Sequence, residues 1–279
     1  MKMTDEEMKI LTPFERKLYR NGYSRQMELT FPDCGPDKKA RISSLLGWMA
    51  VFGGFDYDAR GLTHDVLWER REVFLLSRAV MKINKRPVDR GILNIRTWEN
   101  GIHGARMRRE YRMEYLDGTC AVSGKSEWIL ADPITRKILR PANFTARELL
   151  PRPDGIEIDC PEPEKIRFPD DKNNKNIKIN TGGRVVNWSD LDGNGHVFSG
   201  NYADFVWDFL PADLKERSVK LFAINYSKEA VLGEKIDLRG AFADNNSNSN
   251  SDKENGCDYI VRGDGPDGTC FLCEIIFDK

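Results

Sequence analysis

The chain has 279 residues, of which 43 are Lys or Arg and 44 are Asp or Glu, giving a formal net charge of −1. This balance argues against a general nucleic-acid binder, and 40% hydrophobic with 31% charged residues argues against a wholly disordered chain. The longest apolar-rich stretch, residues 42–55, is too short to span a membrane, which takes about 20 residues.

The first half is predicted to be one helix followed by an antiparallel meander. Apolar side chains recur at helical spacing from residue 37 to about 52, and Gly53-Gly54 provide a stop signal. From residue 72 the hydrophobic period changes to two, and Asp117-Gly118 is a hairpin-turn signal. Strands are predicted at residues 73–83, 92–98, 105–115 and 120–130.

The second half repeats this outline after a stretch, 140–178, whose prolines and charges are typical of a linker. A short helix is predicted at 202–210, ending before Pro211. Residues 244–256, rich in Asn and Ser, are predicted to be a loop. Strands are predicted to end near 185–188 and to run over 219–226, 235–242, 259–262 and 269–277. One helix plus an antiparallel sheet, twice, predicts an α+β fold.

The compartment is predicted from the N-terminus and the cysteines. Residues 1–11 mix acidic and basic side chains and have no apolar h-region, so no secretory signal is visible. The six cysteines are scattered, which fits a reducing compartment better than a disulfide framework. We therefore expect a cytoplasmic protein.

Three histidines are present, and one of them has neighbours that suggest chemistry. His64 and His103 lie in a polar loop and a turn, where a surface role is the better interpretation. His196 closes the run 188–197, which also contains Asp192 and Asn194. A carboxylate can orient an imidazole, and an amide can hold a carbonyl or a water. Turns rich in Asp, Asn and Gly are also common as plain turns, so the residues alone leave both interpretations open.

Two patterns resemble metal sites, and neither is complete. Asp190-x-Asp192-x-Asn194-Gly195 copies the first half of an EF-hand loop, but the twelfth residue is Asn201 where the loop needs Glu. Cys270 and Cys273 form a lone pair whose side chains would face opposite sides of a strand, with Cys273 in the core. We expect no metal and no cofactor.

A basic cluster lies on the predicted strand 105–115 and just before it. Its main members are Arg106, Arg108, Arg109 and Arg112. We interpret it as a solvated strand face balanced by neighbouring glutamates. A docking site for an acidic protein partner is the alternative.

Several runs, in a fixed order, carry a family resemblance over nearly the whole chain. They are 41–49 (RISSLLGWM), Leu76-Ser77-Arg78, Thr97-Trp98, Ser126-x-Trp128-Ile129-Leu130, 188–197 (WSDLDGNGHV), Asn201-Tyr202 and 226–230 (YSKEA). In these runs the sequence resembles the fatty acyl-acyl carrier protein thioesterases of the plant and bacterial kind. The resemblance implies two tandem hotdog domains, each a helix wrapped by an antiparallel sheet. Residues 1–142 would form the acyl-chain pocket, 143–178 the linker and 179–279 the catalytic domain.

The same resemblance implies hydrolysis of the thioester between a fatty acyl chain and the phosphopantetheine arm of acyl carrier protein. By position, the catalytic residues would be Asp192, Asn194, His196 and Glu229. Plant members often carry a cysteine after the glutamate, and here that residue is Ala230. The hypothesis is that Glu229, aided by His196, activates a water while Asn194 and Asp192 position the groups. Direct attack by Glu229 to form an anhydride is the variant.

The partner implied is acyl carrier protein carrying a phosphopantetheine-linked acyl chain, and we expect no nucleic-acid or membrane partner. The protein itself is expected to be a monomer or a homodimer. Three alternatives stay open: a thioesterase for coenzyme A esters, a hotdog enoyl-thioester hydratase, and a non-catalytic module that binds acyl carrier protein. The hydratases carry one more residue between Asn and His than Asn194-x-His196 has.

Overall fold

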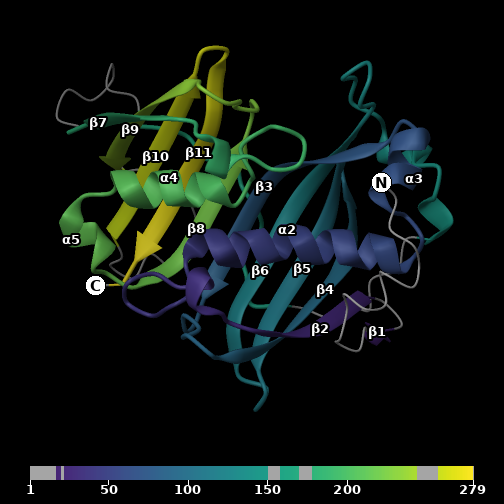
Figure 1. The fold of residues 1–279 in the computed structure, drawn as a ribbon, viewed down its shortest axis with the longest axis horizontal. Coiled ribbons are helices and arrows are strands. Elements are labelled where there is room, and N and C mark those ends of the chain that lie inside the picture. The colour runs from purple at the N-terminus through teal and green to yellow at the C-terminus, as the bar shows by residue number, and fades with distance from the viewer. Residues whose placement is uncertain (1–16, 20–21, 150–157, 170–177, 244–256, 279) are drawn as a thin grey trace.

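The computed structural model describes residues 17–19, 22–149, 158–169, 178–243 and 257–278. Its described strands form one continuous antiparallel sheet in the order β1-β2-β4-β5-β6-β3-β8-β11-β10-β9-β7, with helices α2 and α4 on the same face (Figure 1). The helices are α2 (Ile42–Ala59), α3 (His64–Glu69), α4 (Asn201–Phe209) and α5 (Ala212–Lys215). The strands are β1 (Lys17–Tyr19), β2 (Gly22–Glu28), β3 (Val73–Ile83), β4 (Ile92–His103), β5 (Arg106–Tyr115), β6 (Cys120–Ala131), β7 (Asn180–Val185), β8 (Val219–Tyr226), β9 (Lys235–Phe242), β10 (Cys257–Gly265) and β11 (Gly268–Phe277).

Helix α2 is the centre of the first half, and β2 to β6 curve around it (Figure 1). Its predicted apolar stripe, which includes Leu45, Met49 and Phe52, is buried as expected. The prediction that Gly53-Gly54 end the helix is wrong, because α2 continues to Ala59. The extra turns are held by packing: Asp56 is buried and bonded to the strands beneath, which outweighs the weak helix propensity of glycine.

Helix α4 has the same place in the second half, over β8 to β11 (Figure 1). Phe205 and Val206 on α4 are fully buried, and the Tyr202 ring packs 5.1 Å from the Phe271 ring of β11. The α+β prediction of a helix on an antiparallel sheet, twice, is confirmed.

The two halves join edge to edge through β3 and β8. These strands pair antiparallel, with Val80 opposite Ala223. Above them the two helices touch, and the Ser43 hydroxyl of α2 donates to Asp204 Oδ1 of α4 at 2.6 Å. Side chains from both halves belong to one hydrophobic core. The halves are therefore fixed relative to one another.

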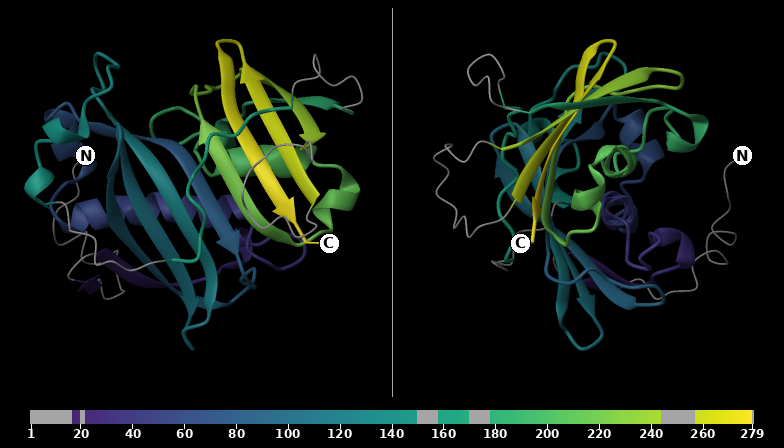
Figure 2. Two further views of the ribbon diagram at one scale, coloured as in Figure 1. Left: turned by 180° about the vertical axis from the view of Figure 1, so that it is seen from behind. Right: turned by 90° about the vertical axis from the view of Figure 1, so that its left-hand side faces the viewer.

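Between the two halves, residues 158–169 of the predicted linker cross the face of the sheet opposite the helices (Figure 2). We call this segment the connection. Cys160 and Ile166 pack there against Val80 and Ala223. Asn225 of β8 fastens the segment, accepting from the Ile166 N–H at 2.8 Å and donating to the Glu164 carbonyl at 3.0 Å. Other parts of the predicted linker, and the whole of the loop predicted at 244–256, lie outside the described residues.

The interpretation of the β5 arginines as a solvated face is wrong for Arg109. Arg109 is only 3% exposed, and Glu110, assigned to the wet face, is also buried. Trp98 and Asn100 donate to Glu110 at 2.9 and 2.7 Å. The outer face is also partly covered by the connection, since Arg108 pairs with Glu162 at 3.2 Å. The cluster is thus largely neutralised within the chain, which weakens the docking alternative.

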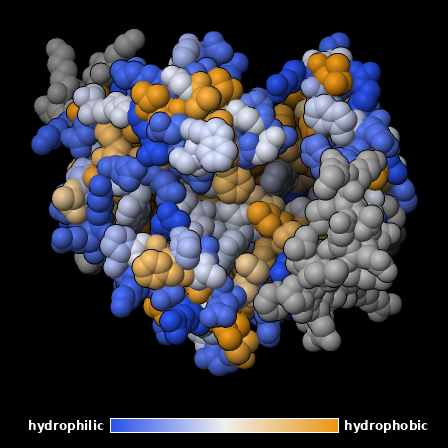
Figure 3. Space-filling model, viewed as in Figure 1, coloured by the Kyte–Doolittle hydropathy of each residue, from blue (hydrophilic) through white to orange (hydrophobic). Residues whose placement is uncertain are grey.

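No helix in the described part of the chain is long and apolar enough to cross a membrane. The face seen in Figure 1 carries hydrophilic and hydrophobic side chains interspersed (Figure 3). Cys270 and Cys273 are buried free thiols, and Cys273 lies in the core as predicted.

Candidate active site

The predicted catalytic loop is a tight turn that precedes α4. The Asp192 N–H donates to the His196 carbonyl at 2.8 Å, and the Gly195 N–H donates to the Asp192 carbonyl at 3.0 Å. Gly195 has φ +80°, which glycine adopts without strain. The Asp192 carboxylate is used inside the turn, where its Oδ1 accepts from the Asn194 N–H at 2.8 Å. Asp192 therefore shapes the turn that presents Asn194 and His196.

Glu229 follows β8 and lies beside this turn. The backbone brings the two segments together, since His196 bridges to Val231 and the Val197 N–H donates to the Ala230 carbonyl at 2.9 Å. As a result, His196 Nε2 lies 3.4 Å from Glu229 Oε2. The imidazole is 26% exposed and the carboxylate 41%, so both are open to a substrate or a water.

Asp190, the first position of the EF-hand-like run, is committed to structure. It is buried, its Oδ2 accepts from the Asn187 N–H at 2.8 Å, and its Oδ1 pairs with Arg184 Nη2 at 2.7 Å. Within the described ranges, no three His, Cys, Asp or Glu side chains gather in a way that could hold a metal ion.

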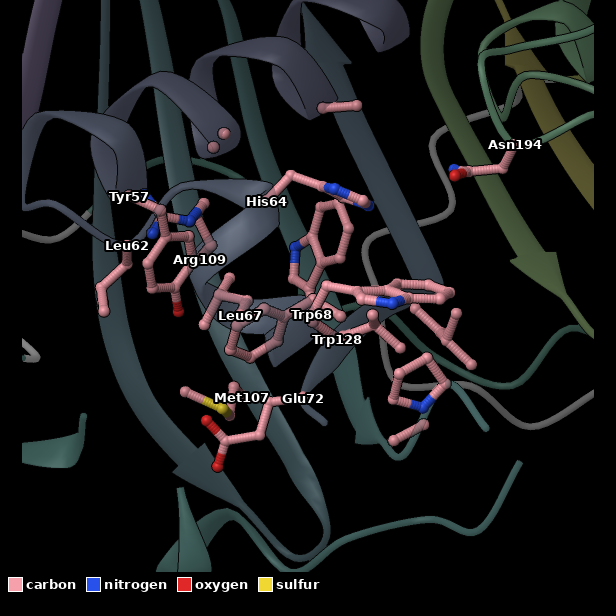
Figure 4. Close-up of a pocket in the computed structure, with 18 of the residues that line it drawn as sticks. Tyr57, Leu62, His64, Leu67, Trp68, Glu72, Met107, Arg109, Trp128 and Asn194 are labelled. Atoms are coloured by element: carbon pink, nitrogen blue, oxygen red, sulfur yellow. The ribbon is translucent and has the colours of Figure 1, made fainter. Parts of the chain in front are cut away.

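A cavity of about 630 Å³ opens beside the predicted residues and extends into the first half. Asn194, His196 and Glu229 all line it, whereas Asp192 does not. Figure 4 shows Asn194 at one end of the pocket, projecting from the second half, and Tyr57 at the opposite end. The volume is within the range of roughly 300–1,000 Å³ that is typical of ligand sites.

The middle of this pocket is apolar and built by the first half alone. Its walls come from α2, α3 and the strands β3, β5 and β6. The apolar side chains on these walls include Leu62, Leu67, Phe74, Met107 and Trp128. Such a surface favours an alkyl chain over a polar ligand.

The end of the pocket far from Asn194 is closed by a buried ionic cluster. Arg109 Nη1 lies 2.7 Å from Asp56 Oδ2, and its Nη2 lies 3.3 Å from Glu99 Oε1. The Tyr57 hydroxyl donates to Glu99 at 2.5 Å, and Arg60 pairs with both carboxylates. Burial, with Glu99 adding to it, raises the pKa of Tyr57 well above its ordinary value. Burial alone would lower the pKa of Arg109, but Asp56 and Glu99 outweigh it and the net shift is upward.

Two parts of the site were not predicted from the sequence. The ionic cluster could have been inferred from the sequence. Arg109 lies between Met107 and Tyr111 on the otherwise apolar face of the strand, and a charge on a buried face needs a buried partner. Arg136, whose Nη1 lies 3.0 Å from Glu229 Oε2, had none, because it comes from an ordinary polar turn in the other half of the chain.

Comparison with known proteins agrees with this arrangement. Residues 20–145 match the acyl-ACP thioesterase N-terminal domain, and residues 173–274 match the acyl-ACP thioesterase C-terminal domain. The two domains follow in this order and together cover most of the chain, so the chain belongs to the acyl-ACP thioesterase family.

Individual relatives are distant in sequence and close in fold. The chain is 22% identical over 194 residues to a chloroplastic acyl-[acyl-carrier-protein] hydrolase of Cuphea viscosissima, covering 66% of this chain and 46% of that protein. The chain therefore spans about half the length of this curated relative. It superposes on an acyl-ACP thioesterase from Bacteroides thetaiotaomicron (TM-score 0.72, 19% identity, 91% and 97% of the chains). It also superposes on a 12:0-ACP thioesterase from Umbellularia californica (TM-score 0.72, 16% identity, 92% and 94% of the chains). The predicted hotdog fold is confirmed by these likenesses.

Proposed function

We propose that this protein hydrolyses fatty acyl-acyl carrier protein thioesters to free fatty acid and carrier protein thiol. The observation that carries the proposal is the His196–Glu229 pair, with Asn194, at one end of an apolar pocket. Membership of the acyl-ACP thioesterase family supports the same reaction. The acyl chain lies in the apolar part of the pocket, and the thioester carbonyl lies at the polar end between Asn194 and Glu229.

The reaction proceeds by attack of a water on the thioester carbonyl carbon. Glu229 accepts the proton from the water as the new C–O bond forms, and His196 holds the other carboxylate oxygen. Asn194 donates to the carbonyl oxygen, which becomes the oxyanion of the tetrahedral intermediate. When the C–S bond breaks, the thiolate takes the proton back from Glu229. Asp192 acts one step removed, because it fixes the turn that carries Asn194.

The carboxylate has no cysteine neighbour that could replace it. Ala230 follows Glu229 and is fully buried, with its carbonyl bonded to Val197. The described free thiols are at Cys34, Cys120, Cys160, Cys270 and Cys273, and none of them lines the pocket. The chemistry is therefore assigned to the carboxylate and the imidazole.

The experiment measures fatty-acid release from a ladder of acyl carrier protein thioesters, short to long, by the parent chain, His196→Ala and Glu229→Gln. We expect each variant to lower kcat about 10²- to 10⁴-fold, the usual contribution of an acid–base group. His103→Ala and Glu216→Gln are the matched controls, since both side chains are exposed and outside the pocket.

The other outcomes separate the alternatives. Faster turnover of acyl-coenzyme A than of acyl carrier protein esters would assign a coenzyme A thioesterase. Hydration of an enoyl thioester without release of acid would assign a hydratase. Tight binding of acyl carrier protein without any turnover, by folded protein, would assign a binding module. Trapping an acyl group on Glu229 would replace the water mechanism by the anhydride mechanism.

A further inference from the structure

Arg136 belongs to the first half, yet it contacts the proposed base in the second. It lies in the turn 132–138 that follows β6, and its Nη1 is 3.0 Å from Glu229 Oε2. This is the same oxygen that His196 Nε2 approaches at 3.4 Å. Among the described residues no hydrogen bond or ion pair is made to Glu229 Oε1. His196 and Arg136 therefore both lie beside Oε2 of the carboxylate, and Oε1 is left for a water.

The turn that carries Arg136 is rigidly built. Asp132 Oδ1 accepts from the N–H groups of Ile134 and Thr135 at 2.8 and 2.9 Å, and the Asp132 carbonyl accepts from the Arg136 N–H at 2.9 Å. Asp132 Oδ2 is in turn paired with Arg71 Nη2 at 3.0 Å. These bonds fix the backbone from which the Arg136 side chain projects toward Glu229.

Arg136 itself has φ +57°, a left-handed conformation that is uncommon for residues other than glycine. Residues held in this region persist only where the surroundings determine them, and they gather at functional sites. An exposed ion pair alone would be weak evidence, since such pairs contribute little to stability. Here the pair joins a constrained turn to a carboxylate that lines the pocket, as Arg136 does.

We propose that Arg136 is a positioning residue for the hydrolysis, whose guanidinium holds the Glu229 carboxylate beside His196 with Oε1 free to take the proton from water. This inference rests on the proposed function and adds a residue to it. No covalent bond to Arg136 forms or breaks in the reaction. This role also makes the reaction depend on both halves, because Glu229 is in the second half and Arg136, which positions it, is in the first.

The test compares Arg136→Ala and Arg136→Lys with Lys137→Ala in steady-state hydrolysis of one acyl carrier protein thioester. Lys137 is a matched control, because it is an exposed residue of the same turn whose side chain forms no ion pair with a described residue, and its backbone bond to Asp132 is unaffected by the substitution. We expect Arg136→Ala to lower kcat about 10- to 100-fold, the scale of a small misplacement of a catalytic group, with KM changed less than about twofold. Arg136→Lys should recover part of the loss, and Lys137→Ala should match the parent.

A double variant distinguishes positioning from a structural role. In a Glu229→Gln background, Arg136→Ala should lower kcat by less than about twofold further, since its effect acts through the carboxylate. A loss of equal size in both backgrounds, or an unchanged kcat in the single variant, would overturn the proposal. A rise in KM alone would assign Arg136 to substrate binding instead.

Crystal structures of the parent and of Arg136→Ala give an answer that does not need turnover. We expect Glu229 beside His196 in the parent and rotated away in the variant. An unmoved Glu229 refutes the positioning role even in an active enzyme. If the parent protein is inactive but Glu229 rotates away in the variant, the proposed function is refuted. The positioning of Glu229 by Arg136 is then still supported.

Discussion

Replacing Arg109 by Met is predicted to destabilise the protein strongly, because it leaves buried carboxylates without their main counter-charge. Arg109 is 3% exposed and binds Asp56 at 2.7 Å and Glu99 at 3.3 Å. Breaking a buried ion pair from one side costs about 3–5 kcal/mol. Arg60 remains beside both carboxylates. The loss should therefore be at the lower end, about 3 kcal/mol in the free energy of unfolding.

The assay is urea unfolding followed by circular dichroism, with a thermal melt beside it. A loss of about 3 kcal/mol corresponds to roughly 5–6 °C in Tm for a chain of this size. Arg106→Met is the control on the same strand, since Arg106 is 32% exposed and its partner Glu127 keeps Arg78 and Arg108 nearby. That control should lose less than about 1 kcal/mol.

Equal stability of the two variants would refute the reasoning, because it would mean that the Arg109 pairs contribute no more than the pair of the part-exposed Arg106 with Glu127. A second set sharpens the test. Arg109→Met combined with Asp56→Asn removes one charge of each sign and leaves Arg60 beside Glu99, so it should recover part of the lost stability. If it does not, the loss came from shape and not from charge.

Two further predictions concern protonation and the connection. Burial raises the pKa of Tyr57, Tyr111 and Tyr226 above the usual 10. Their neutral forms are favoured in the folded state, so the stability they contribute is present below pH 10 and is lost as the pH rises above it. In a pH titration, phenolate absorbance of the folded protein should therefore rise at higher pH than that of the urea-unfolded chain. Coincident titration curves would contradict this prediction. Asn225→Ala should lower the free energy of unfolding by about 1–3 kcal/mol, because it leaves the Ile166 N–H and the Glu164 carbonyl without their partner. A change below about 0.5 kcal/mol would contradict this prediction.

The helix-and-sheet plan was predictable because hydrophobic period is a local signal. The stripe through Leu45 and Met49 and the alternation along β5 both follow from which face must be buried. The end of α2 was not predictable, since local rules stop the helix at Gly53 while the bond between Asp56 and Arg109 lies 53 residues apart in the chain. Long-range partners override local propensity in this case.

The candidate site divides in the same way. The turn from Asp192 to His196 is a compact motif, and the resemblance to a family added Glu229 from a distant segment. Arg136 could not be found, because an arginine in a polar turn has no pattern that distinguishes it from a solvated one. Its contact with Glu229 depends on the pairing of β3 with β8, which sets the two halves side by side.

The first half contains a backbone copy of the catalytic turn. The Gly35 N–H donates to the Lys39 carbonyl at 2.9 Å, as the Asp192 N–H donates to the His196 carbonyl at 2.8 Å. Each turn follows a short 3₁₀ segment with the same capping pattern and precedes a long core helix. By these bonds, Gly35 stands where Asp192 stands, and Lys39 where His196 stands.

The equivalence extends to the base. Lys39 bridges to Val88 as His196 bridges to Val231, which places Arg86 in the position of Glu229. A cation in that position cannot accept a proton from water at neutral pH. Arg86 is used instead as a structural partner, paired with Asp37 at 3.2 Å.

The turn at His196 and its backbone copy face different surroundings in the opposite half of the chain. In the proposed reaction, the turn at His196 needs an apolar cavity in the opposite half to receive the acyl chain. For the turn at His196 the opposite half supplies α2, which leaves space lined by Leu62 and Met107. For the copy it supplies α4, where Trp207 approaches Arg86 at 5.8 Å. In the proposed reaction the acid–base groups therefore come from the second half and the acyl pocket from the first.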